Sequence, residues 1–234
     1  MANDDTDHPD RTAAGAPPAP VEMTVDQALD VALQHHKAGR LAEAENIYRQ
    51  ILTAAPDHHA ALHLLGVIAH QAGDHGQAVE LISKALAAAP NFAEAHCDLG
   101  NALKALGKAE EAMESHRRAI ALNPEYELAH YNLGNALLDL GRFEDAADSF
   151  QKAVDLNPDF AQAHNNLGNM LAELGRYGEA ETMFQKALAL APGYADAEFK
   201  YGVLLLLKGN YEEGWKKYEH RLSPEFTVGL RPPD

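Results

Sequence analysis

The chain is poor in cysteine, tryptophan and basic residues. Among its 234 residues, Cys97 is the one cysteine and Trp215 the one tryptophan. A single cysteine excludes a disulfide within the chain and is typical of a reducing compartment. Lysine and arginine number 19 against 35 acidic residues, so the net charge is -16. This balance argues against a nucleic-acid partner, which needs a basic stripe, and it favours a neutral to basic partner.

Long hydrophobic runs are also missing. The first residues, MANDDTDHPD, are acidic and have no apolar segment, so a secretory signal peptide is not expected. The most apolar run, Val203–Leu207, is far too short to cross a bilayer. We therefore predict a cytoplasmic protein with no membrane partner. Residues 1–22 are rich in Asp, Ala and Pro, a composition that predicts a disordered leader.

Motifs that carry chemistry are scarce. No glycine-rich phosphate loop, nucleophile elbow or paired-carboxylate motif is present. His59 and His63 are one helical turn apart, which suits a shared metal ion, but no cysteine or carboxylate at suitable spacing completes a site. His96, His130 and His164 recur at a fixed period, which indicates packing positions rather than catalysis. We predict no enzymatic activity, no catalytic residue, no cofactor and no metal.

What the chain has instead is a strict period of 34 residues. Six glycines and five prolines each keep this step along the sequence. The glycines are Gly39, Gly73, Gly107, Gly141, Gly175 and Gly209, and the prolines are Pro56, Pro90, Pro124, Pro158 and Pro192. A period of 34 residues is that of a solenoid built from helix–turn–helix units.

The unit Glu127–Phe160 shows the plan most clearly. Apolar residues recur at helical spacing in both halves, around Leu133 in the first and Phe150 in the second. Gly141 is expected to end the first helix, because a residue without Cβ adopts the left-handed cap at no steric cost. Pro158 is expected to close the second, because it has no N–H to donate. The unit is therefore two antiparallel helices joined by a short turn.

This pattern resembles the tetratricopeptide repeat (TPR). The resemblance is carried by Leu133-Gly134, Ala146, Phe150 and Pro158 and by their counterparts in neighbouring units. It implies an all-α, right-handed α-solenoid of about six helix–turn–helix units. The predicted units are 25–58, 59–92, 93–126, 127–160, 161–194 and 195–228, within an array over 25–228 that is followed by a tail at 229–234.

The two end units depart from the pattern. In the first, Ala32 replaces the usual glycine, and in the sixth Gly214 and Arg221 stand where alanine is expected. Pro224 comes two residues early. Such departures are typical of terminal repeats. The changes in the sixth unit also suit a junction to another domain.

The resemblance also assigns residues to a concave groove. In a TPR array the first helix of each unit lines this surface with its second, fifth, sixth, ninth, twelfth and thirteenth residues. The middle units carry asparagines there, and an asparagine offers both donors and an acceptor to the main chain of an extended peptide. The predicted peptide-binding residues are Asn101, Asn132, Asn135, Asn165, Asn166, Asn169 and Lys200. The alternative is that these asparagines cap turns or satisfy the backbones of neighbouring repeats.

Three functions are compatible with these features. The first is a non-catalytic scaffold that binds an extended peptide or partner segment through an asparagine ladder. The ladder, and the phrase Ala163–Asn169, are similar to the TPR superhelix of O-linked N-acetylglucosamine transferases. The alternative is the substrate-recruiting arm of a missing or separately encoded glycosyltransferase, because Gly209–Trp215 resembles the closing repeat of bacterial TPR proteins that continue into such a domain. A third is weak self-association through the C-terminal repeat, where Tyr211, Trp215 and Tyr218 share helical spacing, unless Trp215 and Tyr218 pack inside that repeat.

Overall fold

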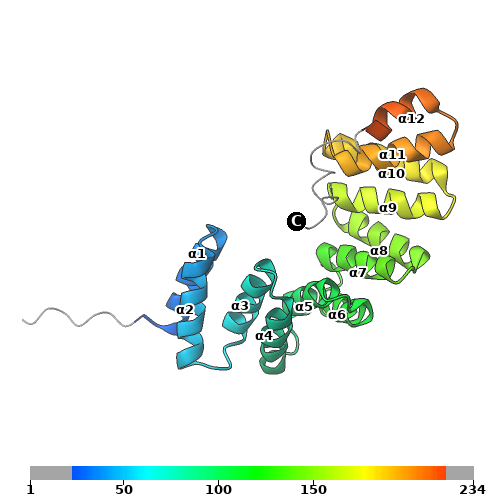
Figure 1. The fold of residues 1–234 in the computed structure, drawn as a ribbon. Coiled ribbons are helices and arrows are strands. Elements are labelled where there is room, and N and C mark those ends of the chain that lie inside the picture. Colours follow the sequence, from blue (N-terminus) through cyan, green and yellow to red (C-terminus); the bar gives the residue numbers. More distant parts are fainter. Residues whose placement is uncertain (1–22, 220–234) are drawn as a thin grey trace, which may run out of the picture.

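The computed structural model describes residues 23–219, and within that range the chain forms twelve helices and no strand. The helices are joined in antiparallel pairs that stack one after another into a curved array (Figure 1). The pairs are α1 (Val25–Lys37) with α2 (Leu41–Ala54), α3 (His59–Gln71) with α4 (His75–Ala88), α5 (Ala93–Ala105) with α6 (Ala109–Leu122), α7 (Glu127–Asp139) with α8 (Phe143–Leu156), α9 (Ala161–Glu173) with α10 (Tyr177–Leu190), and α11 (Ala195–Leu207) with α12 (Tyr211–Tyr218).

The predicted all-α solenoid of helix pairs is confirmed. The first helix of each pair begins 34 residues after the one before it, at residues 25, 59, 93, 127, 161 and 195. None of the helices in the described range is long and apolar enough to span a membrane. The predicted leader at 1–22, the tail at 229–234, and the departures at Arg221 and Pro224 lie outside the described residues.

The repeated glycine ends the first helix of each pair as its position predicts. Gly141 has a φ of +70°, in the left-handed region where a residue without Cβ is not strained. Its N–H donates to the carbonyl of Leu138, and the N–H of Arg142 donates to the carbonyl of Leu137. The turn into α8 therefore satisfies carbonyls that the end of α7 leaves without a helical partner.

In four of the six pairs a glycine on the first helix faces a large side chain on the second. A Cβ atom built on Gly134 would lie 2.6 Å from Cε1 of Phe150, which is fully buried. The absence of that Cβ lets α7 and α8 approach closely around the aromatic ring. The same juxtaposition recurs in three more pairs, at Gly66 and Ile82, Gly100 and His116, and Gly168 and Phe184.

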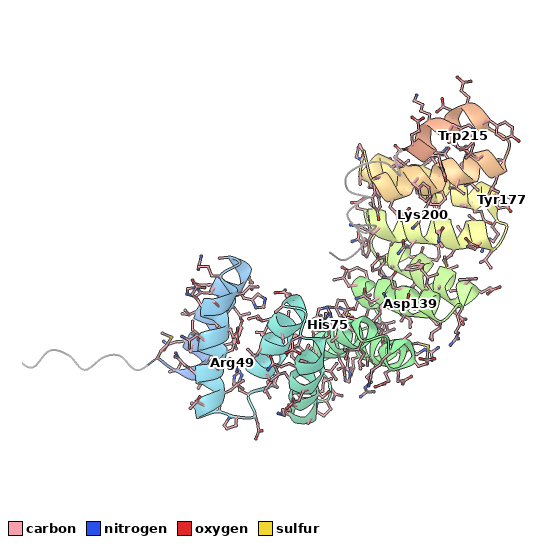
Figure 2. All side chains as sticks on the ribbon, viewed as in Figure 1. Arg49, His75, Asp139, Tyr177, Lys200 and Trp215 are labelled. Carbon is pink, nitrogen blue, oxygen red and sulfur yellow. The ribbon has the colours of Figure 1, made fainter. Side chains whose placement is uncertain are left out.

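The two helices of the sixth pair, α11 and α12, approach each other even more closely. A Cβ on Gly202 of α11 would meet backbone atoms of α12, including the nitrogen of Tyr218 at 2.6 Å. Gly214 takes the place of the expected alanine because its Cβ would lie 2.8 Å from Cγ of Leu206. Tyr218 packs against Phe199, with ring centroids 5.2 Å apart. Trp215 contacts the ring of Tyr218 edge-on, with centroids 5.5 Å apart, but it is 56% exposed at the end of the array and is therefore not buried inside the pair (Figure 2).

Three of the periodic histidines tie successive pairs together. Each lies on a first helix, and its Nε2 atom donates to the carbonyl of the proline in the turn before that helix. The Nε2 atoms of His96, His130 and His164 lie 2.9, 3.0 and 2.8 Å from the carbonyl oxygens of Pro90, Pro124 and Pro158. Because a carbonyl oxygen only accepts, the proton is on Nε2 in all three rings. His164 is buried, as a packing position requires, whereas His96 and His130 are half-buried. All three fasten turns, between pairs two and three, three and four, and four and five.

Candidate functional site

The predicted binding residues all lie on the first helices of their pairs. Adjacent first helices contact one another along the array, as α3 does α5, α5 does α7, and α9 does α11. Four of the predicted asparagines, Asn132 and Asn135 on α7 and Asn166 and Asn169 on α9, are half-buried there. We refer to these four residues as the amide row.

The amide row is joined across the fourth and fifth pairs. The side-chain N–H groups of Asn166 donate to Oδ1 of Asn135 at 3.1 Å and to the hydroxyl of Tyr131 at 3.3 Å. In this contact Asn135 uses only its oxygen, so its own amide nitrogen still has two N–H groups to offer. The bond orients both side chains at the junction of α7 and α9.

Asn165 and Lys200 are placed differently from the amide row. The side chain of Asn165 is fully buried, and its Nδ2 donates to Oδ2 of Asp196 on α11 at 2.7 Å. Lys200 donates to the same carboxylate oxygen at 2.8 Å. Both predicted site residues therefore belong to a polar network, centred on Asp196, that links α9 to α11.

The remaining predicted residues lie toward the third pair. Asn132 places its Nδ2 atom 3.5 Å from the sulfur of Cys97, and Asn101 is half-buried on α5. Burial raises the pKa of the Cys97 thiol to about 11, so the thiol stays protonated and unreactive near neutral pH. Cys97 is thus a packing residue beneath Asn132.

An apolar cavity opens where the amide row ends. It has a volume of about 490 Å³ and lies between α9, α10 and α11, within the range typical of ligand pockets. Asn169 and Lys200 border it, and Tyr177, Val203 and Leu207 are among the residues that line it. Figure 2 shows Lys200 on α11 and Tyr177 at the start of α10.

His59 and His63 of the second pair do not converge on one point. His63 places Nε2 2.7 Å from Oδ2 of Asp98, whereas His59 stacks its ring on His58. Within residues 23–219, no group of three or more His, Cys, Asp or Glu side chains is arranged to hold a metal ion.

Sequence reasoning missed Tyr131 and Asp98 as partners of the inner surface. They are the fifth and sixth residues of their units, and both positions are assigned to the groove by the resemblance. Each bonds a residue 35 positions away, Asn166 and His63 respectively. The register was therefore a sufficient signal for their position, although not for their partners.

Models of a known family match most of the chain. A model described as tetratricopeptide repeat matches residues 32–93, 131–195 and 168–219. A TPR repeat model matches 100–141, and a further tetratricopeptide repeat model matches 81–114. The chain belongs to the tetratricopeptide-repeat family. A search of curated proteins finds no significant match to this TPR chain.

Several solved structures share the TPR fold of this chain. MamA superposes with a TM-score of 0.62 at 27% identity, over 71% of this chain and 98% of MamA. PilF of Pseudomonas aeruginosa gives a TM-score of 0.76 at 21% identity, over 88% and 96% of the two chains. YrrB, described as a TPR protein with an unusual peptide-binding site, gives 0.65 at 22% identity, over 78% and 96%.

Proposed function

We propose that this TPR array is a non-catalytic scaffold that binds an extended peptide or partner segment along its inner surface. The amide row carries this proposal. Its four side chains lie on adjacent first helices, and the bond between Asn135 and Asn166 holds two of them in orientation. A peptide main chain presents donors and acceptors at regular intervals, and amides match both whatever the peptide's side chains.

The net charge of the chain and the expected strength of peptide binding both agree with such a role. The net charge of -16 favours a neutral or basic segment over an acidic one. Each hydrogen bond between the bound peptide and the amide row contributes about 0.5–1.5 kcal/mol net. After ordering costs, a row of this size supports roughly micromolar binding. Asn165 supports the row from below, because its buried amide is held by Asp196.

Removing the amide row is expected to weaken partner binding at least tenfold. The variant carries alanine at Asn132, Asn135, Asn166 and Asn169, and loses about 0.5–1.5 kcal/mol with each missing bond. Partners captured from native lysate by the wild type would be identified, and their binding segments measured as synthetic peptides by fluorescence anisotropy. A matched control, Asn46→Ala/Asn91→Ala, removes two exposed amides away from the first helices. Unchanged affinity in the folded amide-row variant would contradict the proposal.

The alternative role is the substrate-recruiting arm of a glycosyltransferase that is missing or encoded separately. The similarity of Ala163–Asn169 and Gly209–Trp215 to such arms favours it. In that role the inner surface would hold the protein substrate. In either role the proposed location is cytoplasmic. In either role the purified chain is expected to leave a nucleotide sugar unchanged. Transfer or hydrolysis by the pure protein would overturn its assignment as non-catalytic.

Weak self-association remains a separate proposal for the last pair. Trp215 and Tyr211 are 56% and 65% exposed on α12, and exposed aromatic side chains favour association. A sedimentation coefficient that does not change with protein concentration would contradict it.

A further inference from the structure

The inner surface changes from polar to apolar between the fifth and sixth pairs. At the ninth position of each unit, Asn135 and Asn169 are followed by Val203. At the thirteenth position, Glu173 is followed by Leu207. Because the register is the same, the change places an apolar helix face directly after the amide row.

This face borders the apolar cavity between α9, α10 and α11. Val203 and Leu207 line it from α11 and Tyr177 lines it from α10, while Asn169 of the amide row lies at its edge. Leu207 is 67% exposed and Tyr177 is 42% exposed. Large apolar side chains left open to water beside a row of polar groups are typical of a binding pocket.

The charges around the cavity define what it accepts. Lys200 at its edge is bound to Asp196, whose carboxylate also accepts from Asn165. Its positive charge is therefore already compensated. Glu173 adds a negative charge to the lining and repels an acidic side chain, while a buried ammonium or guanidinium would lose its hydration. The cavity suits an uncharged side chain.

We propose that the cavity receives one large apolar side chain, aromatic or leucine-like, of a peptide whose main chain lies on the amide row. The inference rests on the proposed peptide binding and adds the feature by which the array distinguishes one peptide from another. The amides bind any main chain, and the cavity selects the residue that follows.

The test begins with selection of peptides from a random dodecapeptide display library on the intact chain. The selected peptides are expected to share one position occupied by Phe, Tyr, Trp, Leu, Ile or Met. Replacing that residue with alanine in a synthetic peptide is expected to weaken binding about 10- to 100-fold, since a fully buried large apolar side chain contributes on this scale. Fluorescence anisotropy measures both peptides.

Two tryptophan variants then test the location. Val203→Trp fills the cavity and is expected to weaken the binding of the selected peptides at least tenfold. The matched control is Val67→Trp, which makes the same change at the ninth position of the second unit, on α3 far along the array. It is expected to leave affinity unchanged. Circular dichroism melts of both variants establish that the array is folded.

The outcomes separate this inference from the scaffold function. Selected peptides without a shared apolar position, bound equally by Val203→Trp but lost by the amide-row variant, would overturn the cavity's role and leave the scaffold function standing. Selection of no peptide would remove both. A dimer that Val203→Trp converts to a monomer would assign the cavity to a second copy of the chain and overturn the proposal.

Discussion

Replacing His116 with phenylalanine is expected to stabilise the array by about 1–3 kcal/mol. His116 is fully buried against Gly100, and neither ring nitrogen has a hydrogen-bond partner. An unpaired polar group in the core loses its hydration without compensation. Phe150 and Phe184 occupy the same register position in the next two units, so a phenyl ring suits this site. Urea unfolding monitored by circular dichroism measures the gain.

The gain is expected to be larger in mild acid. Burial lowers the pKa of His116 from 6.5 to about 4, with a small opposing effect of the Asp98 carboxylate. Between these two values the unfolded chain binds a proton that the folded chain does not, so the free energy of unfolding falls as the pH drops from about 6.5 to about 4. At pH 5 this loss amounts to about 2 kcal/mol. His116→Phe has no such group and escapes this loss.

The control for this prediction is His130→Phe. His130 donates to the carbonyl of Pro124, so its replacement removes a hydrogen bond and destabilises the array. Equal unfolding midpoints for the wild type and His116→Phe at pH 7 and pH 5 would contradict a cost of burying His116.

Gly202→Ala is expected to destabilise the sixth pair by about 3 kcal/mol, at the upper end of the cost of overpacking. The new Cβ would lie 2.6 Å from the backbone nitrogen of Tyr218 and 3.0 Å from the carbonyl oxygen of Gly214. At Gly134 the atoms in the way belong to a single aromatic ring, but here only a shift of the whole α12 backbone makes room. We therefore expect α12 to separate from α11.

Trp215 makes this change easy to observe. It is the only tryptophan of the chain and lies on α12, so its emission reports on that helix alone. In Gly202→Ala we expect an early transition in emission, before the main loss of the circular dichroism signal. Gly178→Ala is the matched control, because its Cβ on α10 meets nothing within 4 Å. Alanine there is expected to stabilise α10 by at most about 1 kcal/mol, the helix propensity gained over glycine in a helix interior. Coincident, unshifted transitions in Gly202→Ala would contradict the prediction.

The fold was predictable because its main determinants are local and repeated. Gly141 has one low-energy use in this pattern, the left-handed end of a helix, and the chain repeats that use every 34 residues. The register also shows that His116 takes the position of Phe150 in the next unit. Both residues face a glycine of the first helix, Gly100 and Gly134 respectively. What the register did not show is that the imidazole would find no partner there, because this depends on every side chain packed around it.

The accessibility of the asparagines was harder to predict. Asn165 and Asn166 are adjacent in sequence and both fall on positions assigned to the groove, yet Asn165 is fully buried and Asn166 is half-buried. The difference arises from the distance between α9 and α11, which brings Asp196 to within 2.7 Å of Asn165. Spacing between helices is set by packing, and a periodic sequence does not specify it. The apolar cavity depends on the same spacing.

The junction of the fourth and fifth pairs and that of the fifth and sixth pairs are expected to differ in their sensitivity to ionic strength. At the first of these junctions the Nε2 atom of His164 donates to the carbonyl of Pro158 and fastens the turn. At the last junction Glu198 stands in the equivalent position, and an ion pair between Lys208 and Glu181 joins α11 to α10. Salt screens the attraction between partly exposed charges, and it weakens an ion pair more than a hydrogen bond to a backbone carbonyl. We therefore expect rising salt to loosen the attachment of the sixth pair to the fifth, and with it one wall of the cavity, while the amides on α7 and α9 keep their spacing.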